Sequence, residues 1–161
     1  MFAGGDQQKL QTGYLLHQRG AVVEAAKLYR ELIEKDARNY HALHFLGLIE
    51  AGAGHFDKAK PLMARSLAIR PPNVQFIENY AALLVQLGDH AEALLTCGDG
   101  LKVKRDSLSL LYMSAASLLK LGKLPESLAQ FDEVLKIQPN HVAALNERSV
   151  ALAGLNKDDL A

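Results

Sequence analysis

The chain has 161 residues, about one domain, of which 49% are hydrophobic and 22% are charged. Eighteen basic residues balance eighteen acidic ones without a basic cluster, which argues against a nucleic-acid partner. The single cysteine, Cys97, excludes an internal disulfide and a zinc site built from several thiolates, and we expect it to be a small buried apolar residue. No apolar run reaches the roughly 20 residues that span a bilayer, and the N-terminus lacks a signal-peptide pattern. We therefore expect a cytoplasmic protein without a membrane partner.

An interval of 34 residues organises the chain. Glycines recur at this interval, with an asparagine in the fifth place: Gly20, Gly54, Gly88, Gly122 and Asn156. Five residues after each of these stands a small residue: Ala25, Ala59, Ala93, Ser127 and Ala161. A fixed period of this length indicates stacked helical repeats. We predict a single domain over residues 1–161, with repeats at 6–39, 40–73, 74–107 and 108–141 and a partial fifth at 142–161.

Each repeat is expected to hold two antiparallel helices. In the second repeat, residues 40–52 have apolar residues at helical spacing, interrupted by Glu50, and Gly54 ends this helix because glycine adopts the left-handed conformation at little cost. Pro71 and Pro139 mark the ends of the second helices of two repeats. A second series of small residues lies where the two helices of a pair approach: Gly13, Gly47, Ala81, Ala115 and Ser149. Such units bury their apolar stripes only by stacking on their neighbours.

The last residues, LAGLNKDDLA, are predicted to form the turn and the first residues of a second helix in the fifth repeat. The helix before them is apolar over much of its surface. We therefore favour the interpretation that the chain is a piece of a longer protein over one in which this helix caps the array. The same apolar face makes a second copy of the chain a candidate partner, as a homo-oligomer.

These features resemble the tetratricopeptide repeat, a 34-residue helix–turn–helix unit with small residues at two positions, glycine between its helices and proline at its end. The resemblance covers residues 6–161. It implies an all-α, right-handed superhelical solenoid of antiparallel helix pairs, with four repeats and a terminal helix. Ala37 and Arg105 replace the usual proline in the first and third repeats, and leucine, isoleucine or lysine replaces the usual tryptophan.

The family lines its concave surface with the first helix of each repeat, at positions two, five, six, nine and twelve. We call the residues at these positions the first-helix face. Among them we predict that the following side chains line a peptide-binding groove: Gln11, Tyr14, His41, His44, Phe45, Glu78, Asn79, Tyr112, Met113 and Asn146. The face is rich in aromatic and amide groups and nearly uncharged, which suits an extended peptide. Tyr14, Phe45 and Met113 could instead pack between adjacent repeats.

No metal site is expected. His41 and His44 are three residues apart on one helix, a spacing that can ligate a metal, but no third ligand converges with them in the sequence. The chain also lacks a glycine-rich phosphate loop, paired carboxylates and a nucleophile with a base. We predict no enzymatic activity, no catalytic residue and no cofactor. The cations with which chaperone-binding members of the family hold a C-terminal carboxylate are absent from the face.

Several segments are similar to the N-terminal repeats of bacterial proteins related to O-linked N-acetylglucosamine transferases, among them QTGYLLHQRG and SLAQFDEVLKIQPNHVAALNERSVAL. In those proteins the repeats precede a glycosyltransferase domain. The eukaryotic relatives carry asparagines along the groove, where this chain has Gln11, Phe45, Asn79, Met113 and Glu147. Two hypotheses remain: a non-catalytic scaffold that binds a protein or peptide, and the substrate-binding arm of a larger glycosyltransferase.

Overall fold

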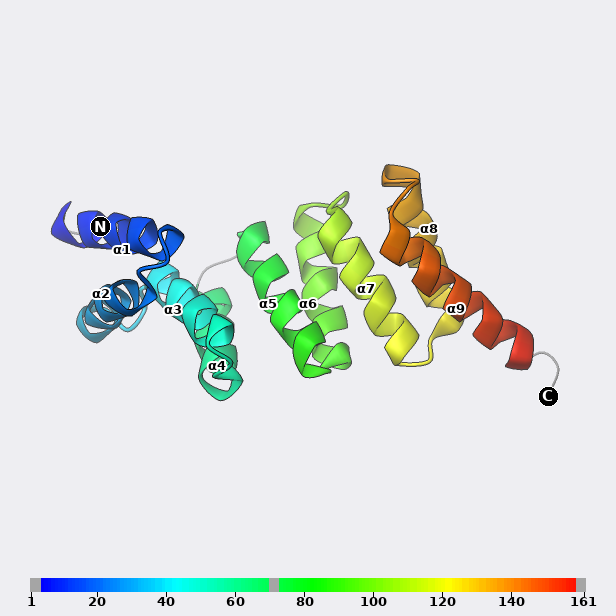
Figure 1. Ribbon diagram of the computed structural model, residues 1–161, viewed down its shortest axis with the longest axis horizontal. Helices are drawn as coiled ribbons and strands as arrows, with labels where there is room; N and C mark the ends of the chain where they lie inside the picture. The colour runs from blue at the N-terminus through cyan, green and yellow to red at the C-terminus, as the bar shows by residue number, and fades with distance from the viewer. Residues whose placement is uncertain (1–3, 70–72, 159–161) are drawn as a thin grey trace. The chain divides into compact units, whose positions relative to one another are not determined.

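The computed structural model describes residues 4–69 and 73–158, which form nine α-helices and no strand (Figure 1). The chain divides into two compact units, Met1–Pro71 and Pro72–Ala161. The first unit contains α1 (Gly4–Gln18), α2 (Val22–Lys35), α3 (Tyr40–Gly52) and α4 (Phe56–Ile69). The second unit contains α5 (Val74–Leu87), α6 (His90–Val103), α7 (Leu108–Lys120), α8 (Leu124–Ile137) and α9 (Val142–Asp158). The prediction of an all-α protein built from helix pairs is confirmed.

Glycine makes the turn inside each of the four complete pairs. Gly20, Gly54, Gly88 and Gly122 have φ angles of 80°, 79°, 77° and 74°, in the left-handed region. In each turn the amide after the glycine donates to the carbonyl five residues earlier, as from Ala21 to Leu16 at 2.9 Å. This Schellman arrangement satisfies the carbonyl groups that the end of a helix leaves free. The glycine period therefore has the physical role that the sequence predicts.

The fifth position of the glycine series behaves differently. A turn is predicted at Asn156, but α9 continues through this residue to Asp158, so that prediction is wrong. Asparagine carries a Cβ atom, which makes the left-handed conformation costlier than in glycine, and right-handed helix is the cheaper alternative. Ala161 and Pro71, which the sequence prediction also used, lie outside the described residues.

The N-termini of the first helices carry caps at the same 34-residue period. Asn39 accepts from the amide of Ala42 at 3.0 Å, and Asn73 accepts from the amide of Gln75 at 3.0 Å. Ser107 accepts from the amide of Leu110 at 3.3 Å. Such side-chain acceptors satisfy amides that the first turn of a helix leaves without intrahelical partners.

Small residues permit the close approach of paired helices. A Cβ atom added to Gly13 would lie 2.8 Å from Cε1 of Tyr29, and one added to Gly47 would lie 2.5 Å from Cγ of Met63. Both distances are shorter than carbon atoms tolerate. In the second unit the Ser127 hydroxyl donates to the carbonyl of Ala115 at 2.9 Å and so joins α8 to α7.

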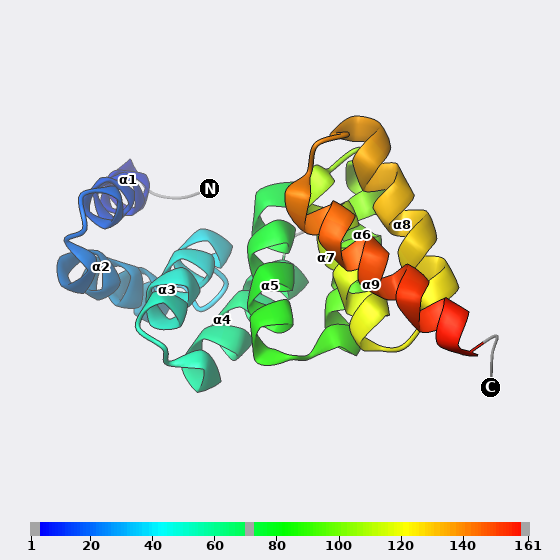
Figure 2. The same cartoon turned by 45° about the vertical axis from the view of Figure 1, so that its right-hand side comes forward.

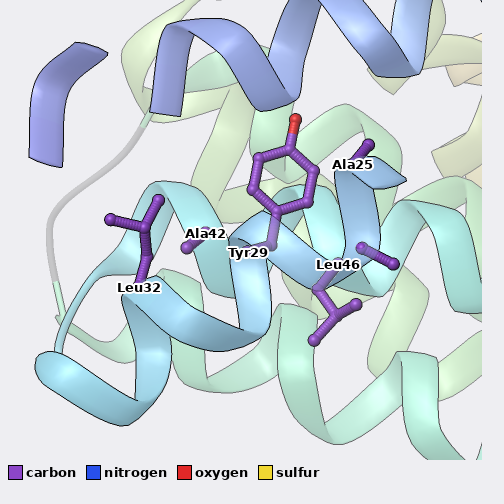
Figure 3. Close-up of a cluster of buried hydrophobic side chains, with 6 residues drawn as sticks. Ala25, Tyr29, Leu32, Ala42 and Leu46 are labelled. Atoms are coloured by element: carbon purple, nitrogen blue, oxygen red, sulfur yellow. The ribbon is translucent and has the colours of Figure 1, made fainter. Parts of the chain in front are cut away.

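Each unit has its own hydrophobic core. In the first unit Ala25, Tyr29, Leu32, Ala42 and Leu46 pack together from α2 and α3 (Figure 3). In the second unit, Phe131 and Val134 of α8 pack against α7 and against Ala144 of α9. Here α7 also contacts both α5 and α9, so the first helices of three repeats are neighbours (Figures 1 and 2).

Glu50, which interrupts the apolar stripe of α3, is 8% exposed yet well satisfied. Its carboxylate accepts from Nη2 of Arg30 at 3.0 Å and bonds Nδ1 of His55 at 2.8 Å. The hydrogen bond from His55 and then the one from Arg30 lower the pKa of this carboxyl group. Because charged groups are buried only at high cost unless they are paired, these two partners explain how the core tolerates a glutamate.

Two glycines of α6 provide a matched test of packing. A Cβ atom on Gly98 would meet nothing within 4 Å, whereas one on Gly100 would lie 2.5 Å from Cδ1 of Leu110 and 2.9 Å from Cγ2 of Ile77. We expect Gly98→Ala to raise the free energy of unfolding by about 0.5–1 kcal/mol, because alanine favours helix. Gly100→Ala is expected to lower it by about 1–3 kcal/mol, because the core there has no room. Urea unfolding followed by circular dichroism measures both, and equal effects would contradict the packing described.

Candidate functional site

The predicted groove residues are divided between the two units. Gln11 and Tyr14 lie on α1, and His41, His44 and Phe45 lie on α3, all in the first unit. The second unit holds Glu78 and Asn79 on α5, Tyr112 and Met113 on α7, and Asn146 on α9. Each unit therefore carries its own part of the first-helix face, and the two parts are described separately.

In the first unit the face is an aromatic cluster centred on the half-buried ring of Phe45. The Tyr14 ring lies 5.5 Å from it at a tilt of 51°, and the Tyr29 ring lies 5.6 Å away in a stacked arrangement. The ring of His41 also stacks on Phe45, at 6.3 Å, and it lies 4.1 Å from the ring of Tyr40. Such offset and tilted ring pairs are favourable beyond the area that they bury. The cluster joins α1, α2 and α3.

His44 is part of this cluster but not of its surface. Its ring is fully buried and meets Phe45 edge-on at 5.8 Å. Burial, and then the nearby His41, lower the pKa of His44 to about 4. The imidazole is therefore neutral at physiological pH. His41 is only partly buried, so the two histidines that the sequence pairs have different environments.

Tyr14 presents the most accessible ring of the cluster, with 42% of the residue exposed. Its hydroxyl oxygen accepts from the side-chain amide of Gln18 at 2.8 Å. Gln11, one turn earlier on α1, is exposed. This edge of the face combines an aromatic ring with polar hydrogen-bonding groups.

In the second unit the face is organised around Tyr112. The Tyr112 hydroxyl donates to Oε1 of Glu147 on α9 at 2.8 Å, and the ring stacks on His141 at 5.0 Å and lies 6.3 Å from Phe131. Burial, and then the bond to Glu147, raise the pKa of Tyr112 to about 12. Tyr112 therefore keeps its proton and links α7 to α9.

The remaining predicted residues of the second unit have different surroundings. Glu78 accepts from the Ser107 hydroxyl at 2.6 Å, and Asn79 accepts from the side chain of Gln75 at 3.2 Å. Asn146 is exposed, whereas Met113 is only 8% exposed. Met113 and the buried His44 thus offer little surface to a partner in this conformation.

His141 and Ser107 are neighbours of the face that the sequence prediction missed. Each precedes a first helix, and each accepts from an amide of that helix: Ser107 from Leu110, and Nδ1 of His141 from Ala144 at 3.2 Å. They belong to the 34-residue series of caps that begins with Asn39. That period is visible in the sequence and could have identified them.

The terminal helix presents an exposed apolar face. Leu145 is 43% exposed and Leu152 is 37% exposed, although their counterparts one repeat earlier, Leu111 and Leu118, are each 7% exposed. The face is the one that the second helix of a repeat covers in the preceding pairs. Self-association through it stays a prediction.

The described part of the chain holds one free thiol, that of Cys97. Cys97 is fully buried, and burial raises the pKa of its thiol to about 12, so it is not poised as a nucleophile. No three His, Cys, Asp or Glu side chains converge there as metal ligands. None of the described helices is long and apolar enough to cross a membrane.

Comparisons with known proteins agree with the helix-pair architecture. Residues 112–161 match the tetratricopeptide repeat family model. A TPR repeat-containing protein of Methanocaldococcus jannaschii is 29% identical over 72 residues, which are 45% of this chain and 21% of that protein. These comparisons support the tetratricopeptide repeat family. The matched region thus spans about a fifth of the length of this curated relative.

Solved tetratricopeptide structures share the fold. The protein YrrB, described as a TPR protein with an unusual peptide-binding site, has a TM-score of 0.85 and 21% identity, and the match covers 90% of this chain and 75% of YrrB. MamA has a TM-score of 0.85 at 13% identity, covering 96% of this chain and 84% of MamA. A tetratricopeptide repeat protein of Parabacteroides merdae has a TM-score of 0.83 at 21% identity, covering 98% and 62%. Similarity at these identities shows the tetratricopeptide fold.

Proposed function

We propose that this chain is a non-catalytic scaffold that binds an extended peptide or a partner protein on the first-helix faces of its two units. The observation that carries the proposal is the set of accessible rings on these faces: Tyr14 is 42% exposed, and Phe45 and Tyr112 are half-buried. Aromatic side chains provide much contact area at little entropic cost, and their polar ends can bond a peptide backbone.

The distribution of charge supports a peptide ligand. The predicted face of the first unit contains no Asp, Glu, Lys or Arg side chain, and Glu78 and Glu147 of the second unit already accept from hydroxyl groups. A surface of this kind has no cation to hold a phosphate or a terminal carboxylate. The fold likeness to YrrB, a protein with a peptide-binding site, is in keeping with the same use. The alternative that the chain is the substrate-binding arm of a larger glycosyltransferase stays a prediction from the similarity of sequence segments.

A pair of matched triple variants tests this proposal. The first-helix variant changes the two faces and combines Tyr14→Ala, Phe45→Leu and Tyr112→Ala. The second-helix variant removes exposed apolar groups from the second helices and combines Val23→Ala, Leu95→Ala and Ile137→Ala. These three residues are 76%, 72% and 48% exposed. In pull-downs from the lysate of the source cells, we expect the first-helix variant to capture at least about tenfold less partner than the wild type, because aromatic anchors dominate interfaces. The second variant should retain it.

Circular dichroism of both variants checks that helicity is unchanged. If the second-helix variant loses the partner and the first-helix variant keeps it, the partner binds the opposite surface and the proposal is wrong.

A further inference from the structure

One side of α9 exposes the apolar residues that a second helix covers in the preceding repeat. Leu145 and Leu152 are 43% and 37% exposed, and Ser149 between them is also exposed. Their leucine counterparts on α7, Leu111 and Leu118, are each 7% exposed. The helix α8 packs on α7, whereas α9 contacts only α7 and α8 among the described helices. We call Leu145, Ser149 and Leu152 the α9 face.

The helix α9 is firmly held on its other side, where it lies against α8 (Figures 1 and 2). Ala151 is fully buried there, and Nε of Arg148 donates to Oδ1 of Asp132 at 2.7 Å. A Cβ atom added to Gly154 would lie 2.8 Å from Cδ1 of Leu124, so α8 and α9 approach closely. The α9 face is therefore in place before a partner binds, and its ordering costs the complex no free energy.

The four complete helix pairs show which kind of helix fits such a face. Each second helix buries a small residue and, four positions later on the same side, a larger one. All eight of these residues are fully buried: Ala25 and Tyr29, Ala59 and Met63, Ala93 and Cys97, Ser127 and Phe131. In the first unit the larger residue lies over a glycine of the first helix, since a Cβ atom on Gly47 would be 2.5 Å from Cγ of Met63. Ser149 occupies the same position of the repeat as Gly47.

We infer that the α9 face binds an amphipathic helix of a partner protein, in which a small residue is followed four positions later by a large apolar residue. This helix covers Leu145 and Leu152, and its large residue lies over Ser149. Amphipathic helices are commonly recognised through apolar residues at such helical spacing. None of the three residues stands at a position of the first-helix face, so the α9 face is a second interaction surface, separate from the proposed peptide-binding faces.

A second copy of this chain fits the α9 face less well. Its second helices already bury their small and large residues within their own pairs. On its α9, the residue four positions after the small one is Ala153, which has no large side chain. Its α1 is polar on the corresponding side, because Gln8 and Thr12 are exposed at the positions where Ala42 and Leu46 of α3 are buried. Neither end of a second copy thus supplies the helix that the pairs require.

Fluorescence anisotropy of the full chain with a labelled peptide of its own residues 122–138, which contain α8, tests the inference. We expect binding in the micromolar to millimolar range, because so short a helix is ordered only on binding. The double variant Leu145→Asp, Leu152→Asp should weaken it at least about tenfold, as should Phe131→Ala in the peptide. Val150→Asp is the matched control: Val150 is 61% exposed on α9 outside the α9 face, and its replacement should change the affinity less than about twofold.

Circular dichroism checks that the helicity of each variant is unchanged. The inference is overturned if the peptide fails to bind at up to about 1 mM protein, or if the Phe131→Ala peptide binds as tightly. It is also overturned if the double variant binds like the wild type, since the peptide then exchanges with α8 itself. A dimer in sedimentation velocity that the double variant abolishes would make a second copy the occupant and overturn it too. The first-helix triple variant leaves the α9 face intact, so the proposed function is tested independently.

Discussion

Replacing Tyr29 by alanine is expected to lower the free energy of unfolding by about 3–5 kcal/mol, as for other large buried aromatic residues. The ring is fully buried, stacks on Phe45 and fills the space that Gly13 leaves on α1. Its loss opens a cavity at the point where α1, α2 and α3 meet, and Gly13 supplies no side chain to fill it. Urea unfolding followed by circular dichroism measures the change.

Tyr29→Phe distinguishes the ring from its hydroxyl group. The hydroxyl oxygen is buried without a partner among the described residues, and burial raises the pKa of Tyr29 to about 12. Removing an unsatisfied polar atom relieves its desolvation, so phenylalanine should leave the stability unchanged or raise it by about 1 kcal/mol. A loss of more than about 1 kcal/mol in Tyr29→Phe would show that the hydroxyl is satisfied in solution, for example by a bound water.

Acidification is expected to destabilise the protein through His44. Its folded-state pKa of about 4 lies below the unfolded value of 6.5, because the ring is buried beside Phe45 and His41. Between these two values the unfolded chain binds a proton that the folded chain does not, so stability decreases as the pH falls. The expected loss is about 2 kcal/mol at pH 5 and about 3 kcal/mol at pH 4, relative to pH 7.

The variant His44→Leu keeps a buried side chain of similar size and removes this titration. The titration of Glu50 affects the stability of both proteins equally. Because its pKa is lowered in the folded state, its stabilising contribution is lost only as the pH falls below its ordinary pKa of 4.5. His17, whose pKa is also lowered by burial, likewise titrates in both. Urea unfolding at pH 7 and pH 5 should therefore show a clearly smaller decrease in the variant. An equal decrease would mean that His44 becomes accessible to protons without unfolding.

The first-helix face shows what a repeat period can and cannot predict about the exposure of a side chain. Position six of each repeat is Gln11, Phe45, Asn79 or Met113, and the period treats these four residues alike. In the structure Gln11 is exposed, Phe45 and Asn79 are half-buried, and Met113 is 8% exposed. Helical phase determines which side of a helix a residue occupies. It does not determine how closely the neighbouring helices cover that side, because this depends on the sizes of side chains from other repeats.

Contacts between the repeats show the same limit. The bond from Tyr112 to Glu147 joins residues 35 positions apart, and the stacking of Tyr112 on His141 depends on the chain between α8 and α9. The sequence shows that Glu50 interrupts an apolar helix stripe, but it does not show the two hydrogen-bond partners of this carboxylate. They lie on α2 and in the turn after α3, and only packing brings them to one carboxylate.

The sequence by itself determined the helix pairs and the turns between them. Glycine at a 34-residue interval supplies left-handed residues at Gly20, Gly54, Gly88 and Gly122, and this property is local, since it requires only the absence of a Cβ atom. The tertiary structure decided what happens at Asn156, where the helix continues, and which first-helix side chains remain accessible. These outcomes depend on which of several possible packing arrangements has the lowest free energy. That choice is not determined by any single residue type.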